Sequence, residues 1–365
     1  MPTASERARR ERRPSGVNLP AAGLALAAAA VLLVLIYVGS RGLRDFDSAL
    51  VGYAVATVFA LAAIVYRYAL WITRPPTWRY FVGGWRNFLS AAQFRRYASL
   101  VPIELWRDIF GQTFLRHRSR SRWIMHLCLF YGVLLSLAVT LPLTFGWIRF
   151  TLVPPEHYQL WVFGLPVVKF GIHAGIGFGL FHALDFTAAL LIVGVAIALW
   201  RRFTDVGLLT TQRFGFDLVP LVLLFAIAVT GVALTASTMW WEGRFYSFIA
   251  LVHEAVVVGW LVSLPFGKFF HLAQRPASVG VTLYQRVSQG LPEAGGAAAG
   301  SLACRRCGAP LPSAQFVSDL KGTLADLGQS YDLGGGRGAL HDYCPTCKRK
   351  LRSSAYYQLL GKRFV

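Results

Sequence analysis

Six stretches of the chain are apolar over roughly the 20 residues that a helix needs to cross a bilayer. They cover about Val17–Val38, Ala49–Ile72, Trp123–Trp147, Val167–Trp200, Phe216–Met239 and Phe245–His271. The first stretch is too long for a removable signal peptide and lacks a small-residue cleavage site, so we count it as a helix. The pattern predicts an all-α membrane protein with six transmembrane helices.

The composition supports this fold class. Hydrophobic residues make up 55% of the chain, charged residues make up 15%, and the mean hydropathy is +0.48. Soluble proteins carry about a quarter charged residues. We therefore expect most of the chain to contact membrane lipid.

The positive charge is distributed unevenly. The formal net charge is +20, and most Lys and Arg lie in residues 1–17, 73–122, 201–213 and 272–365. The segments between the other ends of the spans hold only Arg41, Arg44, Arg149, Lys169 and Arg244. The positive-inside rule then predicts a multi-pass protein of a bacterial or archaeal cytoplasmic membrane with both termini in the cytoplasm. Because anionic lipid accounts for the charge, no nucleic-acid partner is expected.

The spans and the segments between them predict the organisation of the chain. The predicted parts are a basic cytoplasmic N-terminus (1–16), two additional transmembrane helices (17–72), a cytoplasmic amphipathic segment (73–122), a four-helix domain (123–275), a flexible linker (276–300) and a cysteine-bearing cytoplasmic domain (301–365). Apolar residues recur at helical spacing within 103–115. That pattern is typical of a helix that lies on the inner membrane surface or packs on a partner.

Five of the eight histidines lie in the predicted spans, namely His126, His173, His182, His253 and His271. Ionisable residues inside a bilayer are costly and usually functional, and haem iron takes axial imidazoles from facing helices. His126 follows Arg122 by four residues, and His271 precedes Arg275 by four residues. Both lie roughly 6 Å from the inner edge of their spans. They therefore form the best predicted ligand pair, for an inner haem.

A second haem is expected nearer the outer surface. His253 precedes His271 by 18 residues, which on one helix is five turns and roughly 27 Å. Its partner must come from another span. His182 lies roughly 28 Å from the inner edge and His253 roughly 33 Å, whereas His173 lies nine residues further out. The predicted outer pair is therefore His253 with His182, and His173 is the alternative.

Two segments resemble a known family. The stretch from His253 to the element Pro265-Phe266-Gly267-Lys268-Phe269-Phe270-His271 is similar to the last membrane helix of the gamma subunit of respiratory nitrate reductases. It is also similar to membrane cytochromes linked to heterodisulfide reductase and sulfite reductase. Arg122–His126, with Gly132, resembles the family's helix that carries the partner ligands. The likeness covers about residues 100–280 and implies a membrane cytochrome b that exchanges electrons between quinone and iron–sulfur partners.

One departure from the family limits what the resemblance implies. The nitrate reductase members carry a second histidine ten positions after the first, and that position here is Ser136. The inner haem ligands carry over, but the outer ones do so only if His182 or His173 has taken the role. Two b haems are expected, with one haem as the alternative. The groups expected to handle quinone protons are Lys169, His173 and Glu254.

The C-terminal region contains two CxxC pairs, Cys304 with Cys307 and Cys344 with Cys347. Four thiolates in a reducing compartment most often bind structural zinc, and iron is the alternative occupant. Neither pair is followed by histidine, which excludes a c-type haem attachment motif. The pattern predicts a small zinc-ribbon-like domain that docks a partner. Cys128, in the third span, is expected to be a buried apolar residue.

These features predict a haem-binding bundle of six transmembrane helices with a C-terminal zinc-ribbon-like domain. The predicted function is that of an electron-transfer subunit between the quinone pool and a cytoplasmic-side iron–sulfur partner, with substrate chemistry on other subunits. The competing hypothesis is a haem-free membrane anchor whose zinc ribbon docks a soluble protein. A transporter with a histidine proton relay is a third hypothesis, but neither broken helices nor repeat symmetry is evident.

Overall fold

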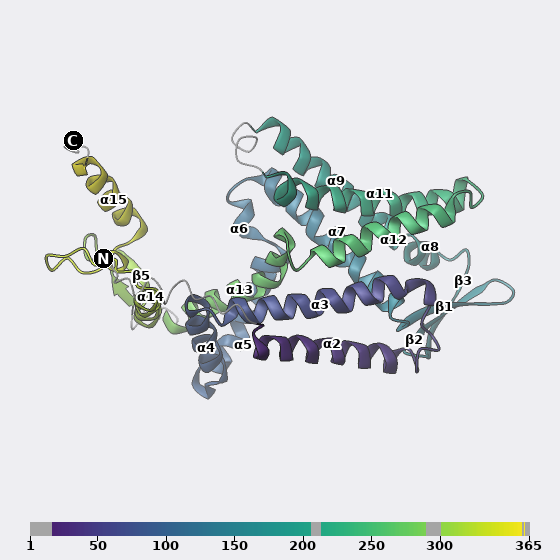
Figure 1. Ribbon diagram of the computed structural model, residues 1–365, viewed down its shortest axis with the longest axis horizontal. Coiled ribbons are helices and arrows are strands. Elements are labelled where there is room, and N and C mark those ends of the chain that lie inside the picture. The colour runs from purple at the N-terminus through teal and green to yellow at the C-terminus, as the bar shows by residue number, and fades with distance from the viewer. Residues whose placement is uncertain (1–16, 206–212, 290–300, 360, 362–365) are drawn as a thin grey trace. The chain divides into compact units, whose positions relative to one another are not determined.

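A computed structural model describes residues 17–205, 213–289, 301–359 and 361. The chain is mostly helical and divides into two compact units. The first unit comprises residues 1–70 and 111–273, and the second comprises residues 71–110 and 274–365. Each is described separately (Figure 1).

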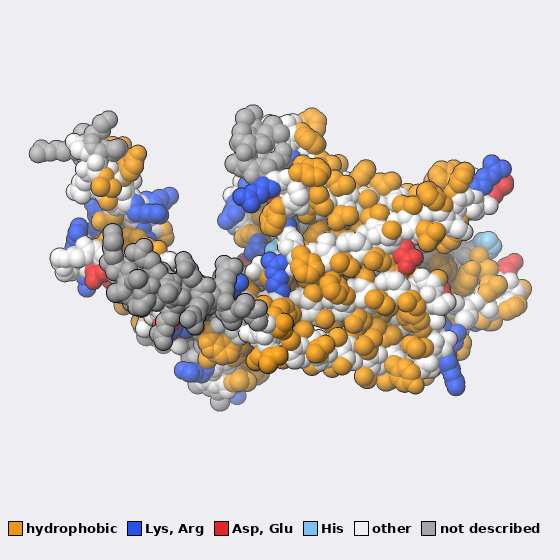
Figure 2. Space-filling model, viewed as in Figure 1, with side chains coloured by type: hydrophobic (Ala, Val, Ile, Leu, Met, Phe, Trp, Pro, Cys, Tyr) orange, Lys and Arg blue, Asp and Glu red, His pale blue; other side chains and the backbone are white. Residues whose placement is uncertain are grey.

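Within the residues that the structure describes, six helices are long and apolar enough to cross a membrane. They are α2 (Leu19–Gly39), α3 (Val51–Ile72, preceded by the turn η1, Ser48–Leu50), α7 (Arg120–Thr144), α9 (Ala183–Thr204), α11 (Val219–Trp240, preceded by the π-helical turn η3, Phe214–Leu218) and α12 (Tyr246–Ser263). Hydrophobic side chains cover the surface over α2 and α3 (Figure 2). The predicted fold class, a helical multi-pass membrane protein in contact with lipid, is confirmed.

The core of the first unit lies between α7, α9, α11 and α12, with α3 alongside (Figure 1). Leu191 and Val195 of α9 pack with Leu224 of α11 and Trp260 of α12. The helices α7 and α9 approach closely because α7 carries Gly132. A Cβ atom at Gly132 would come within 2.7 Å of Leu191. Gly132 is therefore used for helix packing.

The fourth span begins later than the sequence predicted. Residues 148–171 form an antiparallel sheet in the order β1-β2-β3, with β1 at Ile148–Val153, β2 at His157–Val162 and β3 at Leu165–Gly171. A short helix, α8 (Gly175–Phe181), follows, and the span itself starts at Ala183. The predicted start at Val167 is wrong because short apolar strands cannot be distinguished from helix by hydropathy alone.

The sixth span ends earlier than predicted. The helix α12 stops at Ser263, two residues before Pro265, and a turn leads through η4 (Lys268–Phe270) to a new helix, α13 (His271–Gln289). Proline has no backbone N–H, so the ladder of helical hydrogen bonds cannot continue through Pro265 and the span ends here. His253 and His271 are therefore not on one helix, and the five-turn spacing argument is wrong.

The second unit contains α4 (Pro75–Leu89), α5 (Ala91–Glu104) and the π-helical turn η2 (Leu105–Phe110). Tyr97 of α5 packs with Val279 and Leu283 of α13. The amphipathic stretch predicted over 103–115 is not one helix, because a break at Gly111 and Gln112 separates η2 from α6 (Thr113–Arg116), which belongs to the first unit. The linker predicted over 276–300 starts later than expected because α13 continues to Gln289, and residues 290–300 lie outside the described residues.

The C-terminal part of the second unit is small and contains both strands and helices. It consists of β4 (Ser301–Ala303), β5 (Pro310–Ser313), α14 (Ala314–Asp326), η5 (Leu340–Asp342) and α15 (Pro345–Leu359). The helix α14 packs on α4, where Phe316 and Tyr80 have ring centroids 5.2 Å apart. The hydroxyl of Tyr284, on α13, donates to the carboxylate of Asp319 at 2.5 Å.

Candidate haem and metal sites

The structure brings together the two histidines that the sequence paired by depth. His126 lies one and a half turns into α7, and His271 is the first residue of α13. Their imidazole centroids are 6.3 Å apart and their ring planes are inclined at 69°. The two residues are 145 positions apart in the chain, so the fold itself creates this pair.

The separation of the two rings fits one metal between them. A metal–imidazole bond of about 2 Å, with about 1.1 Å from the nitrogen to the ring centre, places two rings on one metal about 6.2 Å apart. The observed 6.3 Å agrees with this value.

Both rings are oriented by hydrogen bonds at Nδ1. The Nδ1 atom of His126 lies 2.6 Å from Oε1 of Gln112, and that of His271 lies 2.6 Å from the carbonyl oxygen of Lys268. Because both partners are oxygen acceptors, each Nδ1 carries the proton and each Nε2 carries the lone pair. Metal-binding histidines are characteristically oriented in this way by a second hydrogen bond.

Gln112 is held in place by an unusual backbone conformation. It is 4% exposed and adopts φ = 47° and ψ = 41°, in the left-handed region, where an ordinary residue is disfavoured by about 1 kcal/mol. The adjacent Gly111 carbonyl accepts a 2.7 Å hydrogen bond from the indole of Trp123, at the start of α7. This bond ties the turn to the helix that carries His126.

The carbonyl that orients His271 is also anchored. The ammonium of Lys268 pairs with Asp217, at the start of the fifth span, over 2.7 Å. Asp217 also accepts a 3.0 Å hydrogen bond from the backbone N–H of Arg213. The segment that presents His271 is therefore fixed by an ion pair.

Arginines contact the residue next to each histidine. The guanidinium of Arg67, on α3, lies 4.2 Å from the ring centroid of Phe270 and donates to the carbonyl of Pro265. Nη1 of Arg201, on α9, lies 4.0 Å from the sulfur of Met125. Cationic groups therefore flank the pair of imidazoles from two other helices.

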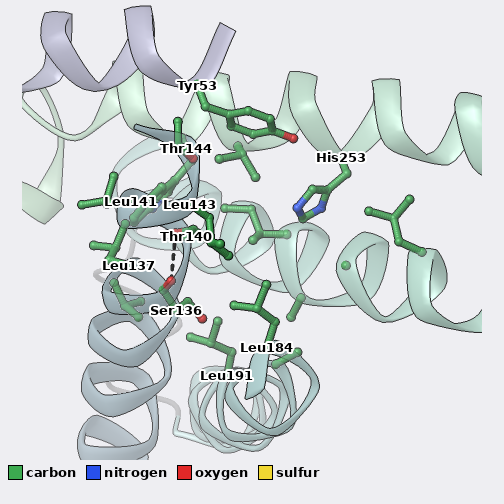
Figure 3. A pocket seen from close by; sticks show the side chains of 18 of the residues that line it. Tyr53, Ser136, Leu137, Thr140, Leu141, Leu143, Thr144, Leu184, Leu191 and His253 are labelled. Atoms are coloured by element: carbon green, nitrogen blue, oxygen red, sulfur yellow. Dashed lines mark hydrogen bonds between the residues drawn. The ribbon is translucent and has the colours of Figure 1, made fainter. Parts of the chain in front are cut away.

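His253 faces a separate cavity of about 400 Å³ (Figure 3). The cavity is bounded by α3, α7, α9, α11 and α12, and most of its lining is apolar. Cofactor sites have volumes of about 300–1,000 Å³ and combine apolar walls with a few polar groups. The polar groups here include His253, Ser136, Thr140, Asp185 and Tyr53.

The imidazole of His253, like those of His126 and His271, has an oxygen atom as the hydrogen-bond partner of its Nδ1. Its Nδ1 lies 2.8 Å from the hydroxyl oxygen of Thr230, on α11. That hydroxyl donates its own proton to the carbonyl of Ala226 at 2.6 Å, so its oxygen accepts from Nδ1 of His253. The lone pair of His253 is therefore on Nε2.

The other predicted outer-site residues lie elsewhere in the structure. His182 is at the junction of α8 and α9, and its Nδ1 lies 2.7 Å from Asp185. His173 and Lys169 are exposed, in the loop after β3 and on β3 respectively. Glu254 approaches α3, where its carboxylate leaves no room for a Cβ atom at Gly52. Among the described residues that line the cavity, His253 is the one histidine.

Ser136 lines the same cavity as His253. Its hydroxyl donates a 2.7 Å hydrogen bond to Thr187 of α9. In Figure 3, Ser136 and Thr140 lie on the side of the cavity away from His253. The position at which the resembling family carries a second histidine thus faces the predicted outer site, but with a short hydroxyl side chain.

The four cysteines of the C-terminal region form one cluster that can hold a metal ion, with all four sulfurs within 4.8 Å of one another. Cys304 and Cys307 lie in the turn between β4 and β5, and Cys344 and Cys347 lie at the start of α15. The sulfurs of Cys307 and Cys344 are 3.6 Å apart. Tetrahedral zinc with bonds of about 2.3 Å would place its sulfurs about 3.8 Å apart.

The thiols of this cluster have uneven proton affinities. Burial raises the pKa of Cys304, but hydrogen bonds from the backbone of Cys344, Arg306 and Cys307 outweigh it and lower that pKa to about 6. Burial, with the neighbouring thiols, raises the pKa of Cys347 to about 12. Backbone N–H groups that already stabilise a thiolate favour a metal at this position.

Sequence reasoning did not find Gln112 or Thr230. Both act through a hydrogen bond to a histidine from a different element, 14 and 23 residues away. The available signal was a polar residue within an apolar span, for Thr230, or shortly before one, for Gln112. That signal does not say which histidine each residue contacts.

Comparisons with protein-family models, with curated proteins and with solved structures find no match to this chain. The functional assignment therefore rests on the geometry of the sites.

Proposed function

We propose that this protein is a membrane cytochrome b subunit that carries electrons between a membrane quinone and an iron–sulfur partner on the cytoplasmic side. The observation that carries the proposal is the pair His126 and His271. Their rings are separated as two ligands of one metal would be, and each Nδ1 is held by an oxygen acceptor. Bis-imidazole ligation of this kind is a common way for helical bundles to bind b-type haem.

The chemical surroundings of the pair suit haem better than a bare metal ion. His126 lies on α7, an apolar membrane-spanning helix, and His271 lies at the start of α13, just after the last span. A flat hydrophobic macrocycle can pack against such apolar helices. Haem also carries two anionic propionates, and Arg67 and Arg201 supply cations from neighbouring helices. When bound, the haem would accept and release one electron at a time. His126 and His271 would hold it, and Gln112 and the Lys268 carbonyl would set their orientation.

Orientation in the membrane follows from the charge distribution. Basic residues flank the inner haem site and the C-terminal region, so both are assigned to the cytoplasmic side of a bacterial or archaeal membrane. The substrate chemistry would lie on partner subunits. On the opposite side, Lys169, His173 and Glu254 would handle the quinone protons.

In this proposal the cysteine cluster holds zinc and stabilises the small domain that meets the partner. The four sulfurs support this proposal, because structural zinc sites are closed by four protein ligands of this kind. Iron at this site would instead add an electron relay.

The same cluster favours the second candidate function, a haem-free anchor whose zinc domain docks a soluble protein. That hypothesis has no use for two imidazoles with oriented Nε2 lone pairs. The two candidates differ in whether the purified protein contains haem.

The proposal is tested by adding a short-chain ubiquinol or menaquinol analogue to the oxidised full-length protein in nanodiscs. After the quinol analogue is mixed with the protein, we expect the absorbance spectrum to change from that of oxidised haem to that of reduced haem. The His271→Ala variant should lose the reducible inner haem, whereas His117→Ala, an exposed histidine near the same end of α7, should not. Haem that quinol does not reduce would contradict the quinone assignment, and protein without haem would contradict the whole proposal.

A further inference from the structure

The cavity shown in Figure 3 is lined by one histidine, His253, whereas the inner site contains two histidines. His253 presents an Nε2 lone pair, since Thr230 accepts the Nδ1 proton. Its Nδ1 is held by an oxygen acceptor, as are the Nδ1 atoms of the two inner ligands. His253 is therefore equipped to bind a metal centre inside the cavity.

The wall away from His253 provides no comparable ligand. The polar side chains labelled there are Ser136, Thr140 and Thr144, and the others are leucines (Figure 3). Serine and threonine hydroxyls are weak ligands for haem iron compared with imidazole, thiolate, thioether or phenolate. Tyr53 also lines the cavity, but it reaches in from α3 on the His253 side of the view.

His182 is the histidine nearest in sequence to this region, and its Nδ1 is bound to Asp185. Asp185 is itself held by the hydroxyl of Thr235 at 2.8 Å. This chain of bonds turns the polar edge of His182 towards Asp185, and it is Asp185 that lines the cavity. Within the described residues, His182 therefore serves to position Asp185.

We infer that His253 is the single protein ligand of a second haem in this cavity, and that its opposite coordination position is open to a small diatomic ligand such as carbon monoxide. The inference rests on the proposed function, because it takes the protein to be a haem protein. It differs from the outer site expected from sequence, which needs two histidines. The cavity volume of about 400 Å³ and its apolar lining are compatible with a macrocycle.

Carbon monoxide separates the two haems because reduced haem binds it only where a coordination position is open. The full-length protein in nanodiscs is reduced with dithionite, and spectra are recorded before and after addition of carbon monoxide. Total haem per chain is measured on the same samples. We expect two haems per chain, of which one, or about half of the absorbance, shifts with carbon monoxide.

Three variants assign that shift. His253→Ala should remove one haem and the whole carbon monoxide response. Ser136→His should keep two haems and abolish the response, because the new imidazole fills the open position. Ser136→Ala is the matched control and should respond like the wild type. Since Ser136→His gains a ligand, it tests the inference even if His253→Ala fails to fold.

The outcomes distinguish this inference from the proposed function. Two haems that both ignore carbon monoxide would overturn the inference and would indicate a second ligand such as His182. A single haem that survives His253→Ala and is lost in His271→Ala would also overturn it, while leaving the proposed function intact. Protein that contains no haem would overturn both.

Discussion

The side-chain oxygen of Gln112 lies 2.6 Å from Nδ1 of His126, across 14 residues of chain. Gln112 is buried, and its backbone is held in the strained left-handed region, so its side chain is fixed in one orientation by the surrounding structure. The carbonyl of Lys268 at His271 and the hydroxyl of Thr230 at His253 have the same role. Three histidines from different elements are thus fixed as the tautomer that binds metal through Nε2.

Replacing Gln112 should change the inner haem without removing it. Gln112→Leu removes the acceptor that Gln112 offers to His126, which makes the imidazole a poorer electron donor to iron. We expect the midpoint potential of one haem to rise by tens of millivolts in a spectroelectrochemical titration. Gln112→Glu keeps an acceptor and should leave the potential unchanged or lower it. A potential that is the same in all three proteins would contradict the assigned contact.

Replacing Thr230 should affect the cavity site alone. Thr230→Val has nearly the same shape but cannot accept the proton of His253, so the ring is no longer oriented. Removal of such an orienting group typically weakens metal binding about 10- to 100-fold. We expect haem content per chain to fall towards one, measured after purification without added haem. Thr230→Ser keeps the hydroxyl and should retain two; equal haem content in both variants would count against the contact.

The cysteine cluster should bind one metal ion per chain. Cys344→Ser removes a buried ligand that lies at the centre of the cluster's hydrogen bonds. We expect elemental analysis to show about one equivalent of zinc in the wild type and little in the variant. Cys128→Ser, in α7, is the matched control and should retain the metal. Zinc bound equally by all three proteins would place the metal elsewhere.

The hydroxyl of Tyr284 should stabilise α14. It is fully buried and donates to Asp319, and a hydrogen bond to a charged group contributes about 2 kcal/mol. Tyr284→Phe should therefore increase amide hydrogen exchange in α14, whereas Tyr356→Phe, an exposed residue of α15, should not. Unchanged exchange in the first variant would show that the bond contributes nothing measurable.

This contact also has a predictable pH dependence. Burial, then Asp319, then the neighbouring Tyr80 and Tyr97 raise the pKa of Tyr284 above its usual value. The folded state therefore holds the phenolic proton more tightly than the unfolded state. Its stabilisation is complete below about pH 10, the ordinary tyrosine value, and is lost as the pH rises through the raised pKa. Above about pH 10, amide hydrogen exchange in α14 of the wild type should therefore accelerate more than the intrinsic pH dependence of exchange predicts. The Tyr284→Phe variant should show no such extra acceleration.

The closeness of His126 to His271 was predictable from sequence, but the helix that carries His271 was not. Helix rise placed His126 and His271 at equal depth, and the structure brings their rings together. The same arithmetic failed for His253 because Pro265 ends the last span and His271 starts another helix. The sequence shows how far a histidine lies from the charged end of its apolar stretch. It does not show which histidine faces it, because that depends on where the helices end and on how they pack.

The strands and the orienting groups were the least predictable features. Residues 148–171 are apolar enough to be taken for the start of a span, and only pairing between strands makes them a sheet. The cysteine cluster was predictable because its ligand spacing is a local property of two turns. Gln112 and Thr230 were not, since each acquires its role from a contact made by the folded chain.

The central claim is that His126 and His271 hold a b-type haem. The most direct measurement is the absorbance spectrum of purified full-length protein, oxidised and then reduced with dithionite, beside the His126→Ala and His271→Ala variants. We predict a sharp α-band on reduction of the wild type, and the loss of one haem per chain in either variant. Well-folded wild-type protein without that band, or variants that keep the full haem content, would contradict the account.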